Sequence, residues 1–261
     1  MRQKKPENGW KSNFKGDLSM KLGVIAAMKI EAEIIIAKMT DKKTESLGGI
    51  EYTTGKIGDC TVICSVCGIG KVFAGMCAQG MIIGFSPDYI INTGVAGTLD
   101  SSLSIGDIAV SSAVVQHDMD TSGIGDPPGL ISGINMIEMP ASEFLGSLIT
   151  DIAKKRGIKC VTGIIASGDQ FIADGNAKKR IRKSFGAVAC EMEGGAVGQV
   201  CTVNEVPFVV IRAISDDADS GAVEDYPSFA KKSAEISADI TVKLAEELLL
   251  HDNPENQKLS L

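Results

Sequence analysis

Two acidic residues, separated by one other residue, stand at the end of a short apolar run. A longer apolar run follows them and also ends in charged side chains. The pair is Glu191 and Glu193, and the second run, residues 207–216, carries Arg212 and ends at Asp216. Both runs have the length and composition of buried β-strands. Ligands bind at the C-terminal edge of the strands in open α/β sheets. We therefore expect an active site where these two predicted strands end.

Carboxylates and a guanidinium at one edge can transfer protons or stabilise a developing charge. Acids at the start of a helix are ordinary, because the helix dipole favours them there. Here, however, Glu31 also begins a predicted helix directly after the first predicted strand, so a further acid reaches the same edge. Buried charges are costly unless they are paired or used. Four such groups, Glu31, Glu193, Arg212 and Asp216, therefore favour a site.

Strand-like and helix-like segments alternate along the chain. The expected strands are residues 21–27, 50–57, 60–66, 89–92, 105–115 and 160–166 together with the two runs above, and the expected helices are 28–39, 71–84, 142–156, 176–184, 192–203 and 226–250. This order predicts an α/β fold, with a mostly parallel sheet between two layers of helices. A Gly-, Asp-, Ser- and Pro-rich stretch, residues 116–135, is expected to be a long loop, and loops of that length are often functional.

The composition bounds the class of protein. The chain has 261 residues, of which 44% are hydrophobic, and its 26 basic and 33 acidic side chains give a net charge of −7. We expect residues 20–250 to form a single domain, with a disordered extension at 1–19 and a polar tail at 251–261. An acidic chain is a poor match for nucleic acid or an anionic membrane. No apolar run is long enough to span a bilayer.

The seven cysteines follow no ligand spacing, and no secretory signal precedes them. We therefore expect reduced thiols in a cytoplasmic protein. The pair Cys64 and Cys67 could suggest a redox or zinc site. Their strand-like context points residues three apart to opposite faces, and the chain has only two histidines to complete a zinc site. Buried thiols are the preferred interpretation, with no metal.

Two further motifs are weak. Gly68-x-Gly70 resembles the start of a dinucleotide fingerprint, but Phe73 stands where the third glycine belongs, and no acid follows at the required distance. His117, Asp118 and Asp120 lack the longer series of oxygen ligands that a calcium loop needs. We expect those acids to cap backbone amides, and we expect no cofactor.

Several motifs in one order carry a family resemblance. The chain from Met20 to about Leu249 resembles the 5′-methylthioadenosine/S-adenosylhomocysteine nucleosidases of the nucleoside phosphorylase superfamily. The matching segments are KLGVIAAMKIEAE (21–33), GIGKV (68–72), INTGVAG (91–97), SGDQFI (167–172), EME (191–193) and RAISDDAD (212–219). The resemblance implies a three-layer α/β/α sandwich, usually a homodimer. It also implies hydrolysis of the N-glycosidic bond of either nucleoside, which releases adenine.

The resemblance implies a role for each acid. Glu31 matches the base that activates water. Glu193 matches the acid that binds the ribose hydroxyls and stabilises the cationic sugar. Asp216 matches the acid that protonates adenine N7, with Ser215 orienting it. These residue types suit the chemistry, because carboxylates stabilise an oxocarbenium-like sugar and a protonated acid assists a poor leaving group.

The substrate-binding residues follow in the same way. Phe171 is expected to stack on adenine, the Ile172 backbone to bind its edge, Met192 to pack on the ribose, and Arg212 to lie near the water. The alkylthio pocket is assigned to Met28, Ile69 and Tyr226. Further substrate contacts are expected from Val95, Ala96, Gly97 and Glu191.

Three features depart from the family pattern. Val95 stands where some members have serine, and Tyr226 takes a position often held by phenylalanine. The loop 120–128 lacks the aromatic residues that many relatives place across the dimer interface, and Ile124 is a partial substitute. We expect this loop, within residues 116–135, to lie near the partner's site.

Other functions stay open at this point. A nucleoside phosphorylase would use phosphate in place of water, but a carboxylate at Glu31 would repel that dianion. A nucleosidase for another purine nucleoside, such as futalosine, shares most of the motifs. A non-catalytic binder of adenosine-type ligands would not need the water-activating acid.

Overall fold

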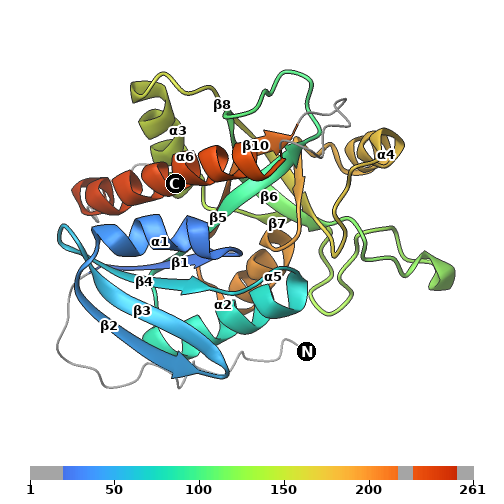
Figure 1. Ribbon diagram of the computed structural model, residues 1–261. Coiled ribbons are helices and arrows are strands. Elements are labelled where there is room, and N and C mark those ends of the chain that lie inside the picture. The colour runs from blue at the N-terminus through green and yellow to red at the C-terminus, as the bar shows by residue number, and fades with distance from the viewer. Residues whose placement is uncertain (1–19, 217–225, 252–261) are drawn as a thin grey trace.

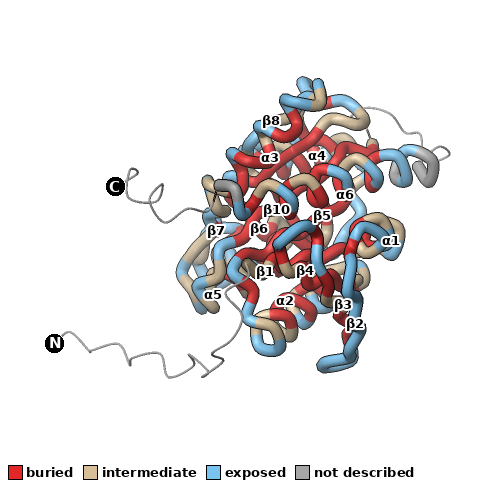
Figure 2. The backbone as a smooth tube through the Cα atoms, turned by 90° about the vertical axis from the view of Figure 1, so that its left-hand side faces the viewer, coloured by how far each residue is buried: buried red, intermediate tan, exposed pale blue. Residues whose placement is uncertain are grey.

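The computed structural model describes residues 20–216 and 226–251. Helices cover both faces of one curved sheet, which gives three layers, α/β/α (Figure 1). The expected fold class is confirmed. Figure 2 shows the buried positions concentrated along the strands and the inward faces of the helices.

The described strands are β1 (Lys21–Ala26), β2 (Thr40–Leu47), β3 (Ile50–Ile57), β4 (Cys60–Val66), β5 (Tyr89–Thr98), β6 (Ile108–Gln116), β7 (Met139–Pro140), β8 (Cys160–Ser167), β9 (Ala189–Glu191) and β10 (Phe208–Asp216). The α-helices are α1 (Lys29–Lys38), α2 (Lys71–Phe85), α3 (Glu143–Lys155), α4 (Gly175–Phe185), α5 (Gly194–Asn204) and α6 (Tyr226–His251). Side-chain caps begin two of these helices. The Ser142 hydroxyl accepts from Leu145 N at 3.3 Å before α3, and Asp174 accepts from Ala177 N at 2.8 Å before α4.

The sheet brings distant segments of the chain together at one edge. Its strand order is β10-β6-β8-β9-β5-β1-β4-β3-β2, and β10 also pairs with β5, so five strands close into a ring. The neighbours β4, β1, β5 and β10 are parallel. Their C-terminal ends therefore meet at one edge, with Arg212 opposite Gly94 and Asp216 opposite Gly97. This edge carries the predicted site.

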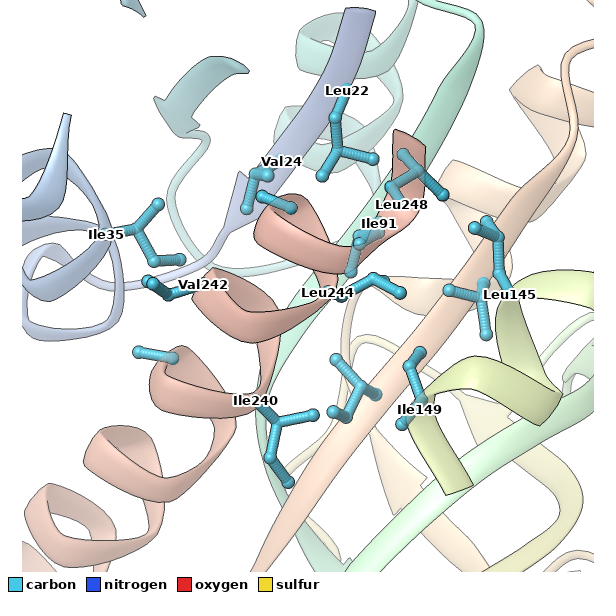
Figure 3. Close-up of a cluster of buried hydrophobic side chains, with 14 of the residues drawn as sticks. Leu22, Val24, Ile35, Ile91, Leu145, Ile149, Ile240, Val242, Leu244 and Leu248 are labelled. Atoms are coloured by element: carbon cyan, nitrogen blue, oxygen red, sulfur yellow. The ribbon is translucent and has the colours of Figure 1, made fainter. Parts of the chain in front are cut away.

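Apolar cores on both faces hold the layers together. One core joins α1, α3 and α6 to the sheet, and Figure 3 shows Leu244 and Leu248 of α6 beside Leu22 and Ile91 of the sheet. A second core joins α2 and α5 to the other face. Burying one such side chain contributes roughly 1.5–3 kcal/mol. The strand ends therefore rest on a rigid support.

Two expectations about the strands were wrong in part. No strand was expected over residues 40–47, where β2 lies. All of its residues are exposed, so no alternation of apolar and polar side chains indicates a strand there. Strand β5 continues to Thr98 instead of ending at Asn92, because its glycines stay extended and pair with β10. The loop 116–135 is long as expected, with a single 3₁₀ turn (Ser122–Ile124) in its described residues.

No helix of the described part of the chain has the length and apolarity needed to cross a membrane. The expected N-terminal extension at 1–19 and the tail from residue 252 onward lie outside the described residues, as does the segment 217–225.

Candidate active site

Arg212 is the centre of a buried polar cluster at the C-terminal edge of the sheet. Its side chain is 1% exposed and donates from Nη2 to Glu191 Oε2 and to the side chain of Asn92. Nη1 donates to the carbonyl oxygens of Asn92 and Ile211, both at 3.1 Å. A second carboxylate, Glu193, lies 3.8 Å from Nη2. A buried guanidinium needs such partners, because its desolvation is otherwise strongly unfavourable.

Glu191 and Glu193 differ in what they bind, although only one residue separates them. Glu191 accepts from the backbone N–H groups of Glu193 and Gly194, at 3.0 and 2.8 Å, and from the Ser167 hydroxyl. These contacts and Arg212 engage both of its oxygens. Glu193 accepts from Gly70 N at 2.9 Å. The protein therefore uses Glu191 largely to organise the site, whereas Glu193 keeps more of its capacity to bind a ligand.

Glu31 approaches the same arginine from the first turn of α1. The buried carboxylate accepts from Ala27 N and Met28 N, both at 3.0 Å. A β-carbon added at Gly94 would lie 3.0 Å from Glu31 Oε1 and 3.3 Å from Arg212 Nη1, so a glycine there allows both groups to approach β5. Burial raises the pKa of Glu31, while the hydrogen bond from Met28 and the charge of Arg212 act in the opposite direction. A raised pKa suits a carboxylate that accepts a proton during catalysis.

Asp216 lies in a pocket beside this cluster. The pocket is lined by Gly97, Gln170, Phe171, Ile172, Lys178, Cys190, Glu191, Met192 and Asp216. Asp216 Oδ2 is 2.8 Å from Lys178 Nζ, and Oδ1 is 3.4 Å from the Ser215 hydroxyl. A β-carbon at Gly97 would lie 2.9 Å from Asp216 Oδ2. The strand therefore needs a glycine here for the carboxylate to occupy this place.

Strand β5 relates the two parts of the site. Gly94 contacts Glu31 and Arg212, and Gly97, three residues later, contacts Asp216. A strand rises ~3.3 Å per residue, so the two glycines are roughly 10 Å apart along the strand. Glu191 belongs to both parts, since it binds Arg212 and lines the pocket of Asp216. The three candidate catalytic acids thus meet along one short path.

The remaining predicted residues take different places. Six of them line the pocket, namely Gly97, Phe171, Ile172, Glu191, Met192 and Asp216. Val95 and Ala96 precede Gly97 on β5, and Ser215 is buried beside Asp216. Met28 and Ile69 do not line this pocket, and Ile69 is 59% exposed. The side chain of Tyr226 lies outside the described residues.

The described residues contain no group of three or more His, Cys, Asp or Glu side chains that could hold a metal ion. Cys64 and Cys67 are buried free thiols, as are most of the other cysteines. Burial raises the pKa of Cys64 to about 12, so the thiolate that redox chemistry requires is disfavoured.

Comparison with known proteins identifies the family. The model of the phosphorylase superfamily matches residues 21–246. The 5′-methylthioadenosine/S-adenosylhomocysteine nucleosidase of Shewanella loihica is 39% identical over 235 residues, covering 88% of this chain and 100% of the relative. The chain belongs to the 5′-methylthioadenosine/S-adenosylhomocysteine nucleosidase family of the phosphorylase superfamily.

Solved structures agree with the nucleosidase fold. The nucleosidase of Helicobacter pylori with butyl-thio-DADMe-Immucillin-A superposes with a TM-score of 0.84 at 34% identity, covering 88% of this chain and 100% of that one. Futalosine hydrolase of Helicobacter pylori superposes with a TM-score of 0.83 at 35% identity, covering 87% and 98%.

Sequence reasoning missed several residues of this nucleosidase site. Lys178 was not singled out, although the structure pairs it with Asp216. Lys178 and Ile181 are three residues apart, a spacing that places both on one face of a helix, and they are the buried residues of α4. That spacing is the sequence signal for Lys178. Ser167 and Asn92 were noted only as parts of motifs, yet both bind the Arg212 and Glu191 pair. Such contacts between distant segments leave no local pattern.

Glu193 should make the stability of the nucleosidase depend on pH. Burial and repulsion by Glu191 raise the pKa of Glu193 from 4.5 to about 7. Between these values the folded protein keeps a proton that the unfolded chain has lost. The contribution to stability is therefore complete below about 4.5 and is lost as the pH rises through about 7. We expect Glu193→Gln to remove this part of the pH dependence, as measured by urea unfolding across that range.

The exposed Glu138 supplies the control for this measurement. Glu138→Gln should keep the wild-type decline in the free energy of unfolding with rising pH. A decline of equal size in Glu193→Gln would contradict the raised pKa.

Proposed function

We propose that this protein hydrolyses the N-glycosidic bond of 5′-methylthioadenosine and S-adenosylhomocysteine, releasing adenine and the 5-thio-substituted ribose. The observation that carries the proposal is the placement of Glu31 and Glu193 around Arg212, with Asp216 in the adjoining pocket. The named relative supports the choice of substrates at 39% identity.

The three acids divide the reaction between them. Glu31 accepts a proton from water as the water oxygen attacks the anomeric carbon. Glu193 binds the ribose hydroxyls, and its charge stabilises the positive sugar of the transition state. Asp216 gives a proton to adenine N7, so that the electron pair of the breaking bond leaves with a neutral base. Arg212 holds the two glutamates near the water.

The pocket residues give the substrate its orientation. Phe171 stacks on adenine, the Ile172 backbone binds the edge of the base, and Met192 packs on the ribose. One wall of the pocket is formed by β5, through Val95, Ala96 and Gly97. Because Gly97 has no β-carbon, the Asp216 carboxylate can lie close to this strand. We assign the alkylthio group to Met28, Ile69 and Tyr226 by family resemblance.

A hydrolase and a phosphorylase on this fold differ in the attacking group. Phosphate would have to enter beside the buried Glu31 carboxylate, and like charges about 4 Å apart repel by roughly 4 kcal/mol at intermediate dielectric. We therefore expect wild-type protein to release adenine from 5′-methylthioadenosine at the same rate with and without phosphate, and to form no sugar 1-phosphate. Chromatography of the products measures both. Adenine release that depends on phosphate would contradict hydrolysis, and no release at all would favour a binder.

Futalosine is the second candidate substrate, because the futalosine hydrolase of Helicobacter pylori has nearly the same fold. The substrates differ at the 5′ position and also in the base, which is hypoxanthine in futalosine and adenine in the other two. Comparison of kcat/KM for 5′-methylthioadenosine, S-adenosylhomocysteine and futalosine decides between them. A higher value for futalosine would replace the proposed substrates.

We also propose a homodimer. The first turns of α2 and the residues before them expose Ile69, Val72, Phe73 and Met76, each at least 47% accessible in the single chain. Contiguous apolar surface of this kind marks a protein interface. The loop 116–135 exposes Ile124 to 83%. We propose that this loop lies near the partner's site. Sedimentation should give twice the chain mass of 27.4 kDa.

The remaining assignments follow from the chemistry. Residues 20–250 form one nucleosidase domain, in keeping with the family match over residues 21–246. The free thiols suit a cytoplasmic protein. We assign the enzyme to methionine salvage, with no cofactor, by family resemblance. A net charge of −7 is consistent with a small nucleoside partner and with the lack of a nucleic-acid partner.

A further inference from the structure

Helix α4 buries one of its basic side chains. Of its basic residues, Lys178 is 6% exposed, whereas Lys179, Arg180, Arg182 and Lys183 are exposed. Lysine is almost never fully buried unless it is paired, because desolvation of an ammonium group is unfavourable. Lys178 and Ile181 form the inward face of the helix. The position of Lys178 therefore calls for a partner inside the protein.

Asp216 is one such partner, and the geometry of the pair is specific. Lys178 Nζ lies 2.8 Å from Asp216 Oδ2, and the Asp216 side chain is 22% exposed, more than that of Lys178. Among the described residues, Oδ1 has only the 3.4 Å contact with the Ser215 hydroxyl. Lys178 thus contacts Oδ2, which leaves Oδ1 available to a ligand in the pocket. Both side chains line that pocket together with Phe171.

We propose that Lys178 is a positioning residue for the leaving-group acid, acting on the departing base through Asp216. This inference rests on the proposed function. Lys178 fixes the Asp216 carboxyl with one oxygen toward the base, and the pair together holds the proton that the base receives. Family motifs in this chain end at Ile172 and resume at Glu191, so they do not include this lysine.

The protons balance in a simple way. Before the reaction the Lys178 and Asp216 pair carries one transferable proton and no net charge. As the bond from the sugar to the base breaks, its electron pair passes to the base, and the proton passes from the Asp216 carboxyl to N7. The base leaves neutral, and the pair is left with a charge of −1. Solvent returns one proton to the pair before the next turnover.

Two substrates test this role, because only one of them needs a proton on its leaving group. 5′-Methylthioadenosine requires protonation of adenine, whereas the 4-nitrophenyl glycoside of 5-methylthioribose releases a stable anion. We expect Lys178→Met to lower kcat on 5′-methylthioadenosine by about 10- to 100-fold, a part of what general acid catalysis supplies. On the nitrophenyl glycoside kcat should stay within about threefold of wild type, because the acid is not needed.

Lys179→Met is the matched control, since it removes the same charge from the exposed side of the same helix. It should change neither rate. Lys178→Arg keeps a cation beside Asp216 and should recover part of the adenine release, and it replaces the methionine variant if that variant does not fold. Thermal unfolding reports whether each variant is folded.

The outcomes separate the two proposals. A wild-type protein that releases no adenine refutes the function and with it any role for Lys178 in that reaction. If wild type is active, equal losses on both substrates reduce Lys178 to a packing role, and unchanged adenine release in Lys178→Met removes the role. A loss confined to the purine substrate supports it.

Discussion

Asp216→Asn should lose about 10²- to 10⁴-fold in kcat on 5′-methylthioadenosine, the range that a positioned general acid contributes. Asparagine has nearly the same shape, and its side-chain oxygen can still accept from Lys178, which lies 2.8 Å from Oδ2 in the wild type. It cannot release a proton to the departing base, however. Steady-state release of adenine measures the effect.

Binding and turnover should separate in this variant. Calorimetry with a non-hydrolysable nucleoside analogue should give a dissociation constant within about tenfold of wild type, because only the proton donor is lost and one hydrogen bond is worth ~1 kcal/mol. Asp151→Asn, on the exposed side of α3, supplies the matched control and should leave both quantities unchanged. Wild-type turnover in Asp216→Asn would remove Asp216 from its role.

The fold could be predicted from the sequence wherever an element buries one face. Strand β10 is apolar almost throughout and helix α3 is strongly amphipathic, and both were expected within one residue of their observed bounds. Strand β2 was missed because it pairs only with β3 and exposes every residue, so its stability comes from backbone hydrogen bonds that leave no hydrophobic pattern.

The candidate site could be predicted as a set of residues but not as a set of contacts. The ends of β9 and β10 identified Glu191, Glu193, Arg212 and Asp216, and the two ends do meet beside Gly97 of β5. The expected reason was wrong in part, because β10 runs parallel to β5 whereas β9 runs antiparallel to it. The division of labour between the two glutamates depends on Gly70 and Ser167, which come from other segments. Residue spacing carries no information about contacts of this kind.

The distance between the water-activating and leaving-group ends also depends on tertiary structure. The segment that contains Gly94 and Gly97, beside which the two ends lie, was not expected to continue the strand beyond Asn92. As an extended part of β5 it separates them by roughly 10 Å, at ~3.3 Å per residue. A nucleoside needs such a separation, because the attacking water and the purine lie on opposite sides of the anomeric carbon.

Glu31→Gln should lower kcat by about 10²- to 10⁴-fold, since the amide cannot accept the proton of the attacking water. Its oxygen can keep the hydrogen bonds from Ala27 N and Met28 N, both at 3.0 Å in the wild type. Its NH₂ group then faces Arg212, another donor, and an unsatisfied buried donor costs ~1–3 kcal/mol. We therefore expect a folded protein of lower melting temperature. Glu33→Gln, exposed on the same helix, should match wild type in both measurements.

The nitrophenyl glycoside distinguishes the loss in Glu31→Gln from the loss in Asp216→Asn. A leaving group that needs no proton should restore turnover to Asp216→Asn, because only proton donation is missing there. It should not restore turnover to Glu31→Gln, because water must be activated whichever group departs. Recovery of Glu31→Gln on that substrate, or a kcat on 5′-methylthioadenosine near the wild-type value, would move the base to another residue. Opposite responses of the two variants would place water activation at Glu31 and proton donation at Asp216.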